Sequence, residues 1–228
     1  MPKKITKTPI YFLPGLAANP SIFKNIKLAP DAFETFYLEW MIPDHNESIV
    51  DYALRFCDKV KHENAVLVGV SFGGIIAQEM GLVRQFKKII IISSVKTRDE
   101  LPLHLQLVGK TKAYKLVPTS LFAQNIDLLS KFAFTKTIVK RLDLYKLYLS
   151  ITDKRYLDWA IEQVVLWDQT TYDPNLIHIH GDLDSIFPIE NIKDCIVVKG
   201  GTHVMILNKY KWLNENLPTI VKQIVTKE

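Results

Sequence analysis

A serine turn bounded by glycines separates two apolar segments and constrains the fold more than any other feature of the sequence. The turn reads Gly69-Val70-Ser71-Phe72-Gly73. Residues 65–70 form an unbroken apolar run, typical of a buried strand, and apolar residues at 75–77 and Met80 fit one helix. A strand that passes into a helix so quickly needs a very tight turn, and the glycines avoid collisions between Cβ atoms. We therefore expect a strained backbone at Ser71, with its hydroxyl projecting above the edge of a sheet.

Five more apolar runs alternate with helical patterns along the 228 residues. Runs without polar alternation are typical of strands that are covered on both faces, as in a parallel sheet. The runs span 10–13, 35–38, 89–92, 176–180 and 195–198. This alternation predicts an α/β fold, with a doubly wound, mostly parallel six-stranded sheet and helices on both faces.

Helical periodicity marks the segments between these strands. Apolar residues recur every three or four positions between Ile49 and Val60, with Asn46 as the expected N-cap. A second helix is predicted over 153–167. In the last predicted helix, Pro218 marks a kink or a new first turn.

Residues 97–171 interrupt the alternation, because they contain no convincing strand. The interval is helical in pattern and rich in large aromatic side chains. An insertion of this size between two strands predicts a helical cap at 97–171. The α/β core then consists of residues 1–96 and 172–228.

A serine hydroxyl is a poor nucleophile near neutral pH and needs a base, which in turn needs an orienting acid. Asp182 and Asp184 directly follow one predicted strand, and His203 lies in a glycine-bearing loop after the last one. The order Ser, Asp, His is that of enzymes with a strand–turn–helix serine. The alternative interpretations are a chance Gly-Ser-Gly turn and a structural histidine.

These segments resemble the α/β-hydrolase superfamily over nearly the whole chain. The resemblance is carried by residues 12–16 (Phe-Leu-Pro-Gly-Leu), the turn around Ser71, the G-x-x-D-x-x-x-P pattern of 181–188 and the Gly-Gly-Thr-His loop that ends at 203. The Asp of the third pattern is the triad acid in that family, which implies Asp184. Asp182 is the second candidate for the triad acid, although its side chain is more readily interpreted as capping the turn. The family's lid falls at 97–171.

The resemblance also implies an oxyanion hole formed by the backbone N–H groups of Leu16 and Phe72. Many members have His-Gly where this chain has Pro14-Gly15, and that histidine often buttresses the loop. Because backbone groups donate, losing the histidine need not remove the hole, and whether Pro14-Gly15-Leu16 forms a competent oxyanion loop is left open.

The expected chemistry is hydrolysis of carboxylic ester or thioester bonds in a small to medium, largely apolar substrate. His203 takes the proton of Ser71 and Asp184 holds the imidazole. Met205 and Trp159 are candidates for the substrate pocket. Two alternatives stay open. One is a triad enzyme of other chemistry, a C–C bond hydrolase or a cofactor-free peroxidase; the other is a catalytically silent ligand-binding or interaction protein on the same fold.

Composition disfavours several other classes. The net charge of +5 is scattered, unlike the stripe of a nucleic-acid binder. Cys57 and Cys195 are too few for a disulfide framework and are expected as thiols in the reducing cytoplasm. No run approaches the roughly 18 apolar residues of a membrane span. His178 and His180 form half a metal site without an identifiable partner, so no metal and no cofactor is expected. Oligomeric state is left open.

Overall fold

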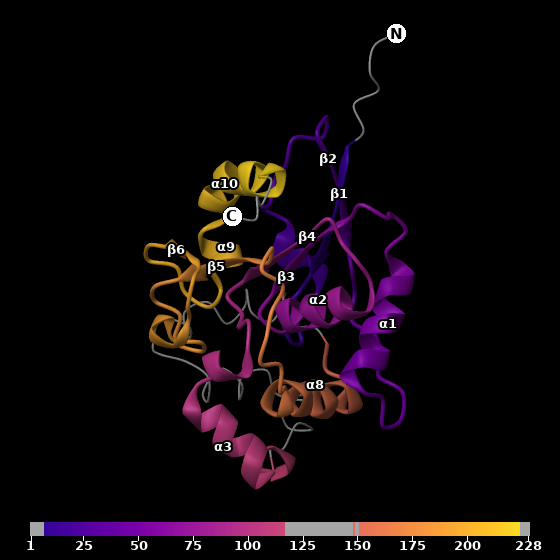
Figure 1. Cartoon of the computed structure of the whole chain (residues 1–228), viewed down its shortest axis with the longest axis vertical. Helices are drawn as coiled ribbons and strands as arrows, with labels where there is room; N and C mark the ends of the chain where they lie inside the picture. Colours follow the sequence, from indigo (N-terminus) through magenta and orange to yellow (C-terminus); the bar gives the residue numbers. More distant parts are fainter. Residues whose placement is uncertain (1–6, 117–147, 149–150, 224–228) are drawn as a thin grey trace.

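The computed structural model describes residues 7–116, 148 and 151–223, and its centre is a six-stranded parallel sheet (Figure 1). The strands are β1 (Thr8–Leu13), β2 (Phe33–Tyr37), β3 (Val66–Val70), β4 (Lys88–Ile92), β5 (Ile177–Gly181) and β6 (Ile196–Val198). They lie in the order β2-β1-β3-β4-β5-β6, and every neighbouring pair is parallel. Each predicted strand falls within two residues of an observed one, so the predicted parallel sheet is confirmed.

The apolar runs form strands here because both faces of the sheet are covered. All residues of β3 and β4 are buried. Along β1, Ile10 and Phe12 enter one hydrophobic cluster, whereas Tyr11 and Leu13 enter the other. Successive side chains of a strand point to opposite faces, so a doubly covered strand needs apolar residues at every position.

Helices pack on both faces of the sheet, as the doubly wound prediction requires. The helices α1 (Ile49–Lys59), α2 (Phe72–Val83) and α8 (Lys154–Leu166) contribute to the cluster that contains Tyr11. The turn η1 (Pro20–Phe23) and the helices α9 (Met205–Asn208) and α10 (Tyr210–Lys222) contribute to the opposite cluster. In the part of the chain that the structure describes, no helix has the length and apolarity to cross a membrane.

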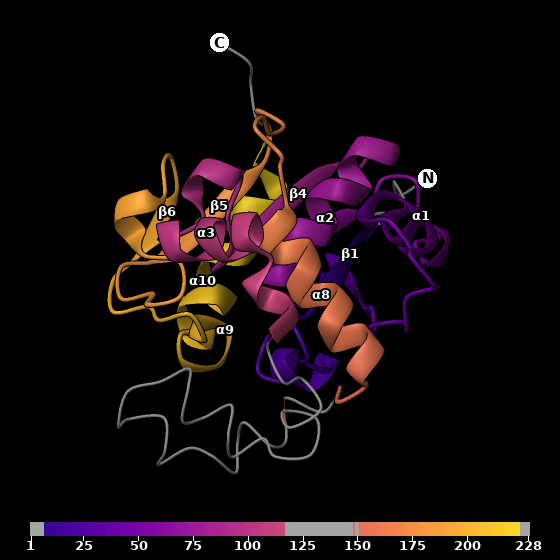
Figure 2. The same ribbon diagram turned by 90° about the horizontal axis from the view of Figure 1, so that it is seen from below.

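The chain between β4 and β5 adds helices at one end of the molecule. It includes η2 (Arg98–Glu100), α3 (Leu103–Thr111), η3 (Ala113–Leu116) and α8. Helices α3 and α8 lie side by side in both views (Figures 1 and 2). The described part of this interval contains no strand, as expected. Residues 117–147 and 149–150 lie outside the described residues, so the division into core and cap stays a prediction.

Two helix details differ from the sequence expectations. The N-cap of α1 is Ser48 and not Asn46: the Ser48 hydroxyl oxygen accepts a hydrogen bond from the N–H of Asp51 at 3.1 Å. Asn46 instead has φ of 58°, a left-handed conformation that asparagine tolerates in the preceding turn. Of the two expectations for Pro218, a new first turn is wrong, because α10 runs through this residue from Tyr210 to Lys222; a kink there stays a prediction.

Candidate active site

Ser71 occupies the tight turn between the end of β3 and the start of α2. Its φ of 52° and ψ of −119° lie outside the regions that L-residues prefer. A Cβ on Gly69 would lie 2.6 Å from the Cα of Gly74, and one on Gly73 would lie 2.9 Å from the carbonyl carbon of Leu13. The two glycines are therefore required by the close approach of strand and helix.

The backbone around Ser71 is held, whereas its hydroxyl is not used to cap α2. The N–H of Ser71 donates to the carbonyl of Ile92 at 2.9 Å, and the hydroxyl of Ser94 donates to the carbonyl of Ser71 at 2.8 Å. These bonds stabilise the strained conformation and leave the Ser71 side chain available for another partner.

That partner is His203. Its Nε2 lies 3.0 Å from the Ser71 hydroxyl oxygen, and its Nδ1 lies 2.9 Å and 3.1 Å from the two carboxylate oxygens of Asp184. A carboxylate only accepts hydrogen bonds, so Nδ1 carries the proton and Nε2 accepts from the serine. The three side chains, which come from turns after β3, β5 and β6, thus form one hydrogen-bonded chain.

The Asp184 side chain is fully buried but well compensated. Its Oδ1 accepts from the N–H groups of Ile186 and Phe187 at 2.9 Å and 3.0 Å. Burial by itself would raise the pKa of the carboxyl, but the hydrogen bond and charge of His203 and the Phe187 N–H outweigh it and lower the pKa below its ordinary value. Asp184 is therefore an anion in contact with His203.

Asp182 has a different partner. Its Oδ1 accepts from the N–H of Gly200 at 2.6 Å, and the N–H of Leu183 donates to the carbonyl of Gly201 at 2.8 Å. Asp182 thus joins the turn after β5 to the loop that carries His203. This differs from the expectation that Asp182 caps its own turn, because the side chain that accepts from the N–H groups of that turn is Asp184.

The loop after β1 lies against Ser71. A Cβ on Gly15 would be 3.6 Å from the Cβ of Ser71, which is ordinary van der Waals contact. Half-buried Leu16 follows, and Ala17 takes φ of 61°. Phe72 is the first residue of α2, and the first N–H groups of a helix have no acceptor within it. Both residues named for an oxyanion hole therefore adjoin the serine: Leu16 follows Gly15, which lies against Ser71, and Phe72 follows Ser71 in the chain.

The two expected pocket residues lie in different surroundings. Met205 is fully buried in the core on the α9 and α10 face, among residues such as Val198 and Leu213. Trp159 of α8 lies beside the tight turn at Ser71 between β3 and α2, called the elbow below, with its ring 6.0 Å from that of Phe72. Its indole N–H donates to the carbonyl of Glu47 at 2.8 Å.

Sequence reasoning missed Trp40, whose indole N–H donates to the carbonyl of Gly15 at 2.9 Å. It comes three residues after β2, at the carboxyl edge where the site is built. A buried aromatic residue with a polar atom, directly after a predicted strand, is the signal that could have pointed to it.

His178 and His180, weighed as half a metal site, bind each other. The Nε2 of His178 lies 3.0 Å from the Nδ1 of His180, whose Nε2 donates to the carbonyl of Phe187 at 2.8 Å. Burial lowers the pKa of both histidines, that of His178 most strongly. Among the described residues, no three His, Cys, Asp or Glu side chains are arranged to hold a metal ion.

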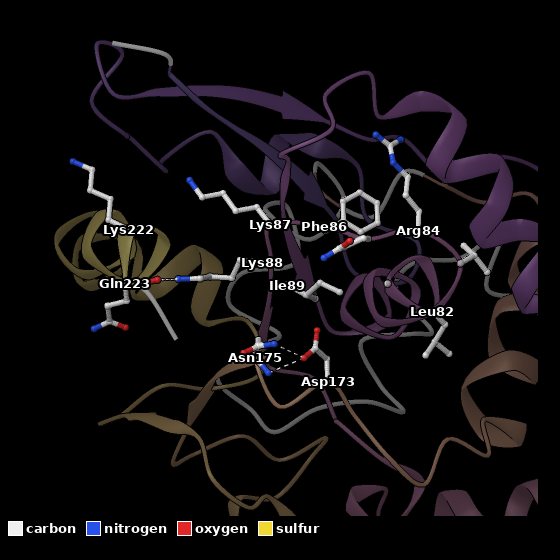
Figure 3. Close-up of a pocket in the computed structure, with 13 residues that line it drawn as sticks. Leu82, Arg84, Phe86, Lys87, Lys88, Ile89, Asp173, Asn175, Lys222 and Gln223 are labelled. Atoms are coloured by element: carbon white, nitrogen blue, oxygen red, sulfur yellow. Dashed lines mark hydrogen bonds between the residues drawn. The ribbon is translucent and has the colours of Figure 1, made fainter. Parts of the chain in front are cut away.

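A surface hollow of about 690 Å³ lies away from this site (Figure 3). It is lined by residues 81–89, Asp173, Asn175, Lys222 and Gln223. Lys88 begins β4, so the hollow is at the amino edge of the parallel sheet, opposite to Ser71. The cation of Lys88 donates to the carbonyls of Ile220 and Gln223 at the end of α10, and is thereby occupied.

No protein-family model and no curated protein matches the chain. Solved structures do match it over almost its whole length. An enol-lactonase from Burkholderia xenovorans LB400 has a TM-score of 0.69 at 14% identity, covering 96% of this chain and 92% of its own. A thermophilic esterase from Thermogutta terrifontis has a TM-score of 0.67 at 14% identity, and the match covers 95% of this chain and 92% of the esterase. A hydrolase from Pseudomonas aeruginosa PA01 has a TM-score of 0.66 at 12% identity, and the match covers 95% of this chain and 91% of that hydrolase. With these matches and its parallel sheet, the chain has the α/β-hydrolase fold.

Proposed function

We propose that this protein is a serine hydrolase that cleaves carboxylic ester or thioester bonds of small to medium, largely apolar molecules. The observation that carries the proposal is the unbroken hydrogen-bonded chain from the Ser71 hydroxyl through His203 to Asp184. A structural histidine has no need of a strained serine at one nitrogen and a buried carboxylate at the other.

The proposed reaction begins with transfer of the Ser71 proton to Nε2 of His203 as Oγ adds to the substrate carbonyl carbon. Asp184 stabilises the imidazolium that forms. When the tetrahedral intermediate collapses, the alcohol or thiol leaves with the proton from Nε2. Water then gives a proton to Nε2 as its oxygen adds to the acyl carbon. When this second tetrahedral intermediate collapses, the bond to Oγ of Ser71 breaks, Oγ takes the proton back from Nε2, and the carboxylic acid departs.

The negative charge that develops on the carbonyl oxygen is stabilised, in this proposal, by the backbone N–H groups of Leu16 and Phe72. Losing one such donor typically costs about 10²–10³ in kcat. Phe72 opens α2, so its N–H is supported by the positive end of the helix dipole. These donors serve any acyl substrate with a planar carbonyl.

The apolar character of the substrate is inferred from the side chains around the elbow. The rings of Trp40 and Phe72 stack at 5.2 Å, and that of Phe187 lies 5.3 Å from the His203 ring. Aromatic side chains beside a few directed polar groups are typical of sites for apolar small molecules. The similar structures of an enol-lactonase and an esterase agree with ester chemistry.

The proposal is tested with p-nitrophenyl esters of increasing acyl length and with a fluorophosphonate probe. We expect the wild type to hydrolyse at least one ester and to bind one fluorophosphonate per protein molecule covalently. Both hydrolysis and labelling should be lost in Ser71→Ala. The matched control is Ser48→Ala, which removes an exposed serine hydroxyl at the start of α1 and should retain both.

The outcomes separate the alternatives. Labelling without turnover of any ester would favour a triad enzyme of other chemistry. Absence of labelling in the wild type would favour a silent binding protein, and equal turnover by Ser71→Ala would refute the assignment of the nucleophile.

A further inference from the structure

Trp40 bridges the loop after β1 and the nucleophile turn. It is buried, and its Nε1–H donates to the carbonyl oxygen of Gly15 at 2.9 Å. The same oxygen also accepts from the N–H of Ala18 at 3.0 Å. The Gly15 carbonyl is therefore held by two donors, of which only the indole comes from outside its own loop.

Fixing this carbonyl also fixes a neighbouring donor. The C=O of Gly15 and the N–H of Leu16 belong to one planar peptide group, and in a trans peptide they point in opposite directions. The loop contains no cis peptide bond in the described residues. By holding the carbonyl of Gly15, which lies next to Ser71, the indole thus sets the direction of the Leu16 N–H.

The indole ring touches the other proposed donor residue as well. It stacks on Phe72 with 5.2 Å between centroids and 28° between planes. On another side it lies 5.6 Å from the ring of Tyr156, whose hydroxyl accepts from the N–H of Ala17 at 3.5 Å. One rigid side chain therefore contacts Phe72 directly and, through the Gly15 carbonyl, holds the peptide group that carries the Leu16 N–H; Tyr156 of α8 packs against it.

We infer that Trp40 is a positioning residue of the oxyanion hole, which aims the Leu16 N–H at the substrate carbonyl oxygen through its hydrogen bond to Gly15. This inference rests on the proposed function. Trp40 forms and breaks no bond in the reaction, so its effect is confined to the stabilisation of the charged intermediate.

The test is Trp40→Phe, which keeps an aromatic ring at the site and removes the N–H. A misdirected N–H should lose a large part of the oxyanion stabilisation that a missing N–H would lose. We therefore expect kcat to fall by about tenfold to 10². KM should change by less than about threefold, because the ground-state ester carries no full charge on its oxygen. A trifluoromethyl ketone, which forms an oxyanion when Ser71 adds to it, should lose affinity by the same factor as kcat/KM.

Two further variants separate positioning from packing. Trp167→Phe removes another buried indole N–H of the same core cluster, one that donates to the Glu79 carboxylate at 2.7 Å, and should leave kcat within about twofold. Replacing Trp40 by β-(3-benzothienyl)alanine keeps the bicyclic shape and removes only the donor. It decides the question if Trp40→Phe does not fold.

Unchanged kcat and inhibitor affinity in either Trp40 variant, beside an active wild type, would overturn the inference and leave the proposed function standing. A wild type that hydrolyses no ester would overturn the proposed function and this inference with it.

Discussion

Replacing Asp184 by asparagine is the sharpest test of the hydrogen bonds that link Ser71, His203 and Asp184, because the structure dictates the orientation of the new amide group. Oδ1 of Asp184 accepts from the N–H groups of Ile186 and Phe187. In Asp184→Asn, the amide oxygen must take this position, since an NH₂ group there would face two donors. The NH₂ group then occupies the Oδ2 position, 2.9 Å from Nδ1 of His203.

An NH₂ group at that distance donates to Nδ1, so the imidazole carries its proton on Nε2 instead. Nε2 then has no lone pair to accept the Ser71 proton. A histidine held in the wrong tautomer typically lowers kcat by about 10⁴ in a triad, which corresponds to about 5 kcal/mol of transition-state stabilisation. KM should change little, because Asp184 is fully buried and does not face the substrate.

The assay is steady-state hydrolysis of the best p-nitrophenyl ester, with circular dichroism to verify folding. The matched control is Asp182→Asn, in which the amide oxygen still accepts from the N–H of Gly200. Only the charge on that hydrogen bond is lost, so kcat should fall by less than about tenfold. Comparable losses in the two variants, or a larger loss in Asp182→Asn, would refute the assignment of Asp184 as the acid.

Two further predictions concern stability. Burial lowers the pKa of His178 and His180 in the fold, so below the unfolded-state pKa of about 6.5 the unfolded chain binds more protons. The free energy of unfolding, measured in urea, should therefore fall as the pH drops below that value, by up to about 1.4 kcal/mol per pH unit for each histidine. His178→Gln should make the free energy of unfolding depend less steeply on pH, and an unchanged dependence would contradict the account. Gly69→Ala places a Cβ 2.6 Å from the Cα of Gly74 and should cost about 3 kcal/mol or more, lowering Tm by at least about 6 °C. Gly15→Ala, whose Cβ meets nothing closer than 3.6 Å, should leave Tm within about 2 °C, and equal melting of the two would show that the elbow tolerates a side chain.

The sheet could be predicted from the sequence because its signals are local. An unbroken apolar run reports that both faces of a strand are covered, and β3 and β4 are buried at every position. The start of α1 shows where such reasoning loses precision. Asn46 and Ser48 are both good N-caps, and only the path of the chain, left-handed at Asn46, decides for Ser48.

For the site, the pattern around Ser71 and the chain order of aspartate and histidine sufficed to name the residues that the fold brings together. The choice between Asp182 and Asp184 rested on a resemblance, and the hydrogen bonds now distinguish their partners. Met205 is a candidate for the pocket because it follows His203 closely in the sequence. Its side chain is buried in the hydrophobic cluster that contains Val198 and Leu213, and its place in the pocket stays a prediction.

By itself, the sequence determined the alternation of strands and helices, the tight turn at Ser71 and the order of the polar side chains at the strand ends. These follow from backbone geometry and side-chain periodicity, which act between residues close along the chain. Only the tertiary structure decided that His203 meets a serine 132 residues away and that Trp40 holds the Gly15 carbonyl. Such contacts depend on the register of packed elements, which no short stretch of sequence encodes, because each side chain's partner is set by how the whole core fills its space.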